Sequence, residues 1–159
     1  MERFQRIIWN DKFKKEYMRL TELEREREFC RHDMEHFLAV ARLCYIFVLE
    51  NRMEISKDII YGTAFLHDLG RVAQYEQGIS HDEAGALLAE SILTECGYQE
   101  SERKLMVDTI RKHRHLKQDD TGFSGIFYRA DKLSRDCIHC KARKDCYWPD
   151  EKKNDNYVC

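Results

Sequence analysis

Apolar residues recur at helical spacing along most of the chain, and the alternation typical of strands is scarce. The pattern predicts one or two charged amphipathic helices within residues 2–29, a helix over 34–51 and another from 56 to about 68. Three more helices are predicted over 80–97, 101–113 and 123–137. The chain is therefore expected to be all-α, a bundle of about five to seven helices.

The pattern changes near residue 136. Residues 1–136 are expected to form a helical domain, in which the helices of residues 1–29 pack on a core of residues 30–136. Residues 137–159 are polar and rich in Cys, and we expect them to form a small C-terminal tail.

Composition narrows the class of protein. At 159 residues the chain fits one domain, and 43% hydrophobic with 35% charged residues suits a globular fold. A net charge of −2 gives no electrostatic case for binding nucleic acid or an anionic membrane. No apolar run approaches the roughly 20 residues of a membrane-spanning helix, and the charged N-terminus lacks a signal-peptide core. We expect a cytoplasmic protein whose seven Cys are reduced thiols or metal ligands.

Three His-Asp pairs occur in the chain: His32-Asp33, His67-Asp68 and His81-Asp82. Asp33 and Asp82 fall at predicted helix starts, where unpaired N–H groups and the helix dipole stabilise a carboxylate. Asp68 falls in the last turn of an apolar helix, where the dipole opposes negative charge, so a compensating cation is expected. With His67 beside it, this cation is expected to be a metal ion. The alternative is a neutral His-Asp pair bonded within the core.

Other His and Asp residues occupy places that favour a shared metal site. His36 lies on an apolar helix face, and Asp131 follows an apolar stretch. His81 begins a predicted helix and His113 ends another. Each alone is explained as an ordinary buried residue, but one metal centre explains them together. Imidazole and carboxylate ligands suit Fe, Mn, Co, Ni or Zn and do not distinguish between these metals.

The stretch "TAFLHDLGR", residues 63–71, resembles the "LLHDIGK" motif of the HD-domain superfamily of metal-dependent phosphohydrolases, with Arg71 in place of the usual Lys. The resemblance covers roughly residues 30–136. It implies an HD-type helical bundle, with a first metal held by four residues: His36, His67, Asp68 and Asp131.

The segments "ISHDEAGALLAESIL" and "TIRKHR", followed by "IFYRADKLSR", are similar to a two-metal subset of that superfamily, closest to the bacterial enzymes that split diadenosine tetraphosphate. The similarity implies that His81 and His113 hold a second metal and that Asp68 bridges the two. No "GYP" signature follows, which disfavours the cyclic-dinucleotide phosphodiesterases that carry it.

Three further residues are candidates for additional metal or substrate contacts: His32, His115 and Arg135. His32 lies four residues before His36, hence on the same face if the helix extends back that far. With Asp33 as the N-cap, His32 would instead lie just outside the helix. The resemblance suggests His115 as a further neighbour of the second metal.

The resemblance implies a metal-dependent phosphohydrolase, in which metal-activated hydroxide cleaves a phosphate ester or anhydride of a nucleotide or similar small molecule. Its catalytic candidates here are Asp68, Arg71 and Lys132. Arg71, Lys132 and Arg135 are expected to reach substrate phosphates, the alternative for each being a solvated surface charge. Two other functions stay open: an HD-type two-iron oxygenase, and a module that binds nucleotide and metal without catalysis.

The tail carries a second candidate metal site. Cys137 and Cys140 are separated by two residues, a spacing at which both thiolates can hold one ion, and Cys146 follows. The fourth ligand is expected to be Cys159, His139 or a residue from the core. Structural zinc is the first expectation for cytosolic thiolates and an iron–sulfur cluster the second. The alternative is free thiols, which fits three other cysteines well: Cys30, Cys44 and Cys96.

Overall fold

The computed structural model describes residues 2–117 and 120–158, and this part of the chain contains helices and no strand. The all-α prediction is thereby confirmed. The helices are α1 (Arg3–Trp9), α2 (Asp11–Leu23), α3 (Met34–Glu50), α4 (Lys57–Leu66), α5 (Arg71–Gln77), α6 (His81–Glu95), α7 (Glu100–Lys112), α8 (Gly122–Leu133) and a short 3-10 helix, η1 (Asp150–Lys152). Eight α-helices in the described residues exceed the expected upper number by one.

The starts of α3 and α4 follow their capping residues. The Asp33 carboxylate accepts a hydrogen bond from the His36 backbone N–H at 3.0 Å, as an N-cap does. The Ser56 hydroxyl accepts one from the Ile59 N–H at 3.3 Å. The predicted third helix ends slightly early, at Leu66, so Asp68 lies in the turn that follows rather than in the last helical turn.

The short helix α5 was not predicted. Gly70 follows the helix predicted to end at about residue 68, and it is the residue from which α5 starts, with ordinary right-handed dihedrals of φ −62° and ψ −11°. The helix ends at Gly78, whose φ of +70° places it in the left-handed region that glycine tolerates. This reversal packs α5 against α6. It brings the start of α6 back beside the His67-Asp68 turn, where a Cβ added at Gly85 would lie 3.6 Å from the His67 carbonyl oxygen.

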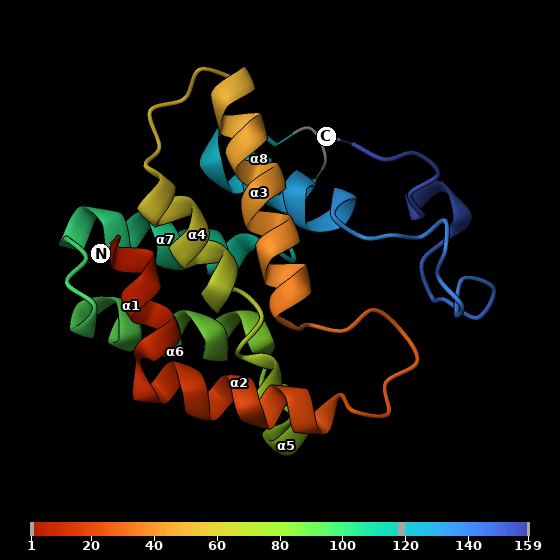
Figure 1. Ribbon diagram of the computed structural model, residues 1–159, viewed down its shortest axis with the longest axis horizontal. Coiled ribbons are helices and arrows are strands. Elements are labelled where there is room, and N and C mark those ends of the chain that lie inside the picture. The colour runs from red at the N-terminus through yellow and green to blue at the C-terminus, as the bar shows by residue number, and fades with distance from the viewer. Residues whose placement is uncertain (1, 118–119, 159) are drawn as a thin grey trace.

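The core lies where α3 packs against α4 and α8, and where α6 packs against α7 (Figure 1). Large fully buried side chains come from four helices: Phe13, Phe37, Phe65 and Phe127. The N-terminal helices contribute as expected, with Ile7 and Leu20 completely buried. Burial of such side chains supplies roughly 1.5–3 kcal/mol each, which makes this shared apolar cluster the main support of the bundle.

The last helix of the bundle is shorter than predicted. It ends at Leu133, so Cys137 belongs to the irregular segment that follows. Figure 1 shows this segment reaching away from α8 on one side of the bundle. Within the described ranges, no helix is both long and apolar enough to cross a membrane.

Candidate metal centre

Six titratable side chains from five places in the fold meet in the interior. His36 comes from α3, the His67-Asp68 turn follows α4, His81 begins α6, His113 follows α7, and Asp131 lies on α8. All six are buried, from 0% exposure for His67 to 6% for His36. Their convergence matches the set that the sequence suggested as metal ligands.

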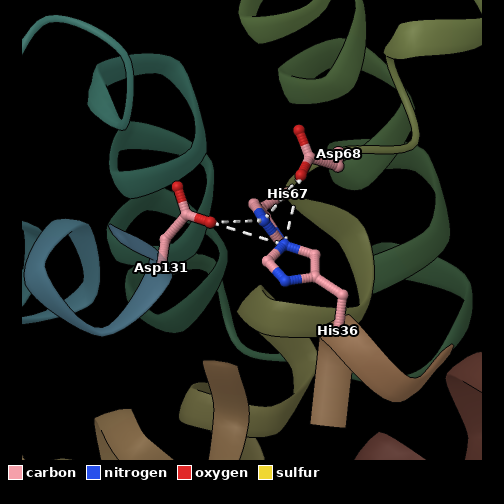
Figure 2. A group of neighbouring side chains, drawn as sticks. All are labelled: His36, His67, Asp68 and Asp131. Atoms are coloured by element: carbon pink, nitrogen blue, oxygen red, sulfur yellow. Dashed lines mark ion pairs between the residues drawn. The ribbon is translucent and has the colours of Figure 1, made fainter. Parts of the chain in front are cut away.

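Figure 2 shows one half of this cluster, in which two imidazoles face two carboxylates. One potential ligand atom from each of His36, His67, Asp68 and Asp131 lies within 4.8 Å of the others. The His67 Nε2 is 2.9 Å from Asp68 Oδ2, and the His36 Nε2 is 3.4 Å from Asp131 Oδ1. These four residues could hold a metal ion.

The second half of the cluster shares Asp68. His81 Nε2 and His113 Nε2 lie 3.6 and 3.9 Å from Asp68 Oδ1, and 3.3 Å from each other. Asp68, His81 and His113 form a second group that could hold an ion. One carboxylate oxygen therefore faces each group, which is the arrangement a bridging carboxylate requires.

Hydrogen bonds on the far side of the rings orient three of these imidazoles. His67 Nδ1 lies 2.8 Å from the Ala64 carbonyl, His81 Nδ1 lies 2.7 Å from Gln74 Oε1, and His113 Nδ1 bonds the Ile110 carbonyl. Because these oxygens are acceptors, Nδ1 carries the hydrogen in each ring and Nε2 presents a lone pair to the centre.

The surroundings of the His67 Nε2 show whether the site fits a metal ion. Among the described residues it is a buried nitrogen without a hydrogen-bond partner, although it faces two carboxylates. A nitrogen left without a partner at this depth is costly, and either a proton or another electron-pair acceptor can occupy the space in front of it. A metal ion is such an acceptor, so the donor set fits a divalent cation.

The charges of the side chains in the centre also favour a bound cation. Burial by itself raises the pKa of Asp68, but Arg71, His67 and His32 outweigh it and hold that pKa well below its usual range. Burial lowers the pKa of His67, yet Asp68 and Asp131 reverse this and raise it to about 9, so a proton occupies Nε2 at pH 7 until a metal displaces it. Two ionised carboxylates in the interior thus draw positive charge to the position between them, which a bound cation would supply.

His81 and His113 are neutral near pH 7. Burial, aided by Arg71, lowers the pKa of His81 to about 3. Burial also lowers the pKa of His113 to about 4. Neutral imidazole is the form that binds metal, so both rings are available as ligands at physiological pH.

His32 lies inside this centre, although the sequence left open whether it would. It is 4% exposed, and its Nε2 is 3.8 Å from Asp68 Oδ2. Its Nδ1 lies 2.6 Å from Glu24 Oε1, and Glu24 also accepts hydrogen bonds from the His32 N–H and the Tyr75 hydroxyl. The sequence did not single out Glu24, because it is one of several acidic residues in the charged run "TELEREREF".

The centre opens onto a cavity of about 400 Å³ lined by basic side chains. Arg71 donates from Nε to Asp68 Oδ1 at 2.8 Å, and Lys132 donates from Nζ to Asp131 Oδ2 at 2.7 Å. Arg135 places Nη2 3.1 Å from His36 Nε2. Arg114, not singled out in the sequence, also lines the cavity. Arg71, Lys132 and Arg135 therefore contact candidate ligands, whereas Arg114 contacts Ser80 and Asp82.

The structure does not bring His115 to the centre. Its side chain is 70% exposed, and Nε2 lies 2.8 Å from Asp82 Oδ2. The chain turns outward after α7, so His113 points inward and the residue two positions later points to the surface. His115 is therefore no neighbour of the two ligand groups.

The structure brings three of the candidate tail ligands to one place. Cys137, Cys140 and Cys146 line the same cavity, together with Cys30 from the loop before α3. His139 is exposed and contacts Asp136 and Tyr157, away from this lining. Cys159 lies outside the described residues.

The protein is thus an all-α bundle with a candidate two-metal centre, in which two groups of possible ligands share the buried Asp68 carboxylate. The chain belongs to the HD domain family, whose match spans residues 33–136. The suggested resemblance is confirmed at the level of this family.

Two relatives extend the comparison. An uncharacterized protein from Clostridium beijerinckii is 40% identical over 154 residues, which cover 97% of each chain. The crystal structure of a predicted HD superfamily hydrolase from an uncultured Thermotogales bacterium matches with a TM-score of 0.65 over 90% of this chain and 79% of that one. Because it is only 20% identical, that likeness supports the fold alone.

Proposed function

We propose that this protein is a metal-dependent phosphohydrolase that cleaves a phosphate ester or anhydride of a nucleotide or similar small molecule. The observation that carries the proposal is the Asp68 carboxylate, with Oδ2 toward one ligand group and Oδ1 toward the other, beside a cavity rich in Arg and Lys. Membership of the HD domain family supports the same conclusion.

The proposed ligands divide between two positions. His36, His67, Asp68 and Asp131 would hold the first metal, and Asp68, His81 and His113 the second. When bound, divalent metals supply Lewis acidity and lower the pKa of a coordinated water to near neutrality. Asp68 would hold its two oxygens toward the two positions, and the Nδ1–H bonds of the imidazoles would keep the lone pairs aimed inward.

The lining of the cavity supports a phosphorylated substrate. Arg71, Lys132, Arg135 and Arg114 face it, and such cations bind phosphoryl oxygens and stabilise the charge that develops on them. Phe29, Tyr147 and Trp148 line its other parts, and aromatic faces suit a nucleobase. A volume of about 400 Å³ is in the usual range for a small-molecule site.

A substrate and metal screen tests the proposal. Protein stripped with a chelator and reloaded separately with Mn, Fe, Co, Ni or Zn is expected to release phosphate or nucleotide from a panel of mononucleotides, nucleoside triphosphates and diadenosine tetraphosphate. The last of these is included because of the resemblance around His81 and His113. Oxygen uptake by the Fe-loaded protein with no phosphate release would favour an oxygenase, and nucleotide binding with no turnover would favour a binding module.

Replacing Lys132 by Met is expected to raise KM for the substrate found in that screen by about 10- to 100-fold. A hydrogen bond to a charged group contributes roughly 1.5–3 kcal/mol, which corresponds to this range. Lys132 is no ligand, so bound metal measured by elemental analysis is expected to stay unchanged. The matched control is Lys104→Met, an exposed position on α7 that does not line the cavity. An unchanged KM in Lys132→Met would show that this ammonium does not contact substrate.

A further inference from the structure

Four cysteines from two distant parts of the chain line one cavity: Cys30, Cys137, Cys140 and Cys146. Contacts next to them hold the two segments together. The rings of Phe29 and Tyr147 meet edge to face with centroids 6.3 Å apart. Arg135 donates from Nη1 to the Arg31 carbonyl at 2.9 Å, which ties the end of the bundle to the loop before α3. The Cys30 thiol and the tail thiols therefore share one location.

The tail is folded around its thiols by Arg143. Its Nη1 donates to the Cys137 carbonyl at 2.9 Å, and its backbone N–H donates to the Cys140 carbonyl at 3.1 Å. Arg27 holds the opposite segment by donating from Nε to the Cys30 carbonyl at 2.9 Å. These bonds fix the backbone on both sides of the cavity that the four cysteines line.

Electrostatic contact between the thiols agrees with this placement. Burial is the largest influence on the Cys30 thiol and raises its pKa. The Cys140, Cys137 and Cys146 thiols raise it further, against the opposing effect of Arg135. Four thiolates this close would repel one another, so a positively charged centre between them is needed before all four can ionise.

The tail has no apolar core that would explain its fold. Among residues 137–158, Cys137 and Ala142 are the buried hydrophobic residues, and η1 is the sole helical element. A segment of this size usually needs a disulfide or metal to hold it, and no disulfide occurs among the described cysteines. A metal group held by the thiols would provide that support.

We propose that Cys30, Cys137, Cys140 and Cys146 bind an iron–sulfur cluster through four Fe–S bonds. Each bond replaces an S–H bond, and the four protons pass to solvent as iron and sulfide are taken up. Cys30 thus supplies the fourth ligand, as a residue from the core, which the sequence left open beside Cys159 and His139. The cluster would hold Tyr147 and Trp148 as one wall of the cavity above the candidate metal centre.

The spacing of the thiols favours a cluster over the single zinc ion expected first. Tetrahedral zinc with bonds of about 2.3 Å brings its four sulfurs to about 3.8 Å from one another. Groups of described ligand atoms that all lie within 4.8 Å of one another occur at Asp68, and the four thiols form no such group. A cluster of several irons holds its thiolates farther apart than one ion does.

Acid-labile sulfide tests the proposal, because the His/Asp centre has no sulfide and its own metal cannot contribute. The full chain, reconstituted anaerobically with iron and sulfide, is expected to bind sulfide and gain visible charge-transfer absorbance. Cys30→Ser is expected to lose most of both signals. Cys96→Ala, at a buried thiol outside the cavity lining, is the matched control and is expected to retain them.

A measurement on the unmutated protein covers the case in which Cys30→Ser does not fold. Peptide mapping after alkylation should find the four thiols protected in the reconstituted protein and reactive together after the cluster is stripped. Reactivity of Cys30 in the reconstituted protein would overturn the proposal. So would protection of the four thiols by zinc with no sulfide bound, or full sulfide in a folded Cys30→Ser variant. Phosphate release is measured separately, so failure here leaves the proposed hydrolase activity untouched.

Discussion

Replacing Asp68 by Ala is expected to remove metal from both positions of the centre and to lower phosphate release by about a thousandfold or more. Asp68 is the residue shared by both ligand groups, so its loss takes one ligand from each. It also leaves the Arg71 guanidinium, which donates to Oδ1, without its carboxylate. Loss of a single stabilising group at a reaction centre already costs roughly 100- to 1000-fold, and loss of the activating metals costs more.

Elemental analysis of the purified variant, followed by the phosphate-release assay, checks this expectation. His113→Ala provides a graded comparison, because it removes a ligand from the second group and leaves the first intact. Asp82→Asn is the matched control: Asp82 is equally buried and also follows a His, but its carboxylate bonds Ser80 and His115. Full metal content in Asp68→Ala would refute the assignment of the centre.

Asp68 also shows why part of the centre could be predicted from the sequence. A carboxylate at the apolar end of a helix needs a cation, and this local requirement is visible in residues 63–71 alone. The other ligands stand at helix ends or on apolar faces, positions that the hydrophobic period reveals. The prediction therefore depended on local rules that the tertiary structure does not override, although the helix ended slightly earlier than expected, at Leu66.

The places of Glu24 and Cys30 could not be predicted from local sequence patterns. Both lie between α2 and α3, because the helices predicted within residues 2–29 already end at Leu23. Their partners come from the C-terminal tail or from a buried ring. Glu24 looks like one more solvated charge, and Cys30 like an isolated thiol. Their positions follow from the path of a loop over the surface of a finished bundle, which spacing along the sequence does not encode.

The unpredicted helix α5 has a similar cause. Gly70 follows a helix, a place where glycine commonly adopts the left-handed conformation that ends the helix. Its backbone is instead right-handed, and a left-handed turn occurs only later, at Gly78. The reason for glycine at position 70 is space rather than dihedral freedom. An added Cβ would lie 2.0 Å from the His81 carbonyl oxygen and 2.4 Å from the Gly85 nitrogen.

Replacing Gly70 by Ala is therefore expected to destabilise the protein by about 3 kcal/mol or more. The clashing atoms belong to the backbone of α6, which cannot rotate away as a side chain can. Relief requires α6 to shift, and His81 begins that helix, so metal affinity at the second position should fall more than at the first. Urea unfolding and metal titration measure the two effects.

The matched control for this close approach is Gly85→Ala, on the facing side of the same contact. Its added Cβ would meet its nearest neighbours at 3.5 Å, which is ordinary van der Waals distance, and Ala favours the helix more than Gly does. We expect Gly85→Ala to unfold at an unchanged or higher urea concentration and to keep both metal affinities. If Gly70→Ala behaved in the same way, α6 would not be held against the His67-Asp68 turn, and Asp68 and His81 would not belong to one centre. The close packing of the two glycines is thus what joins the halves of the site.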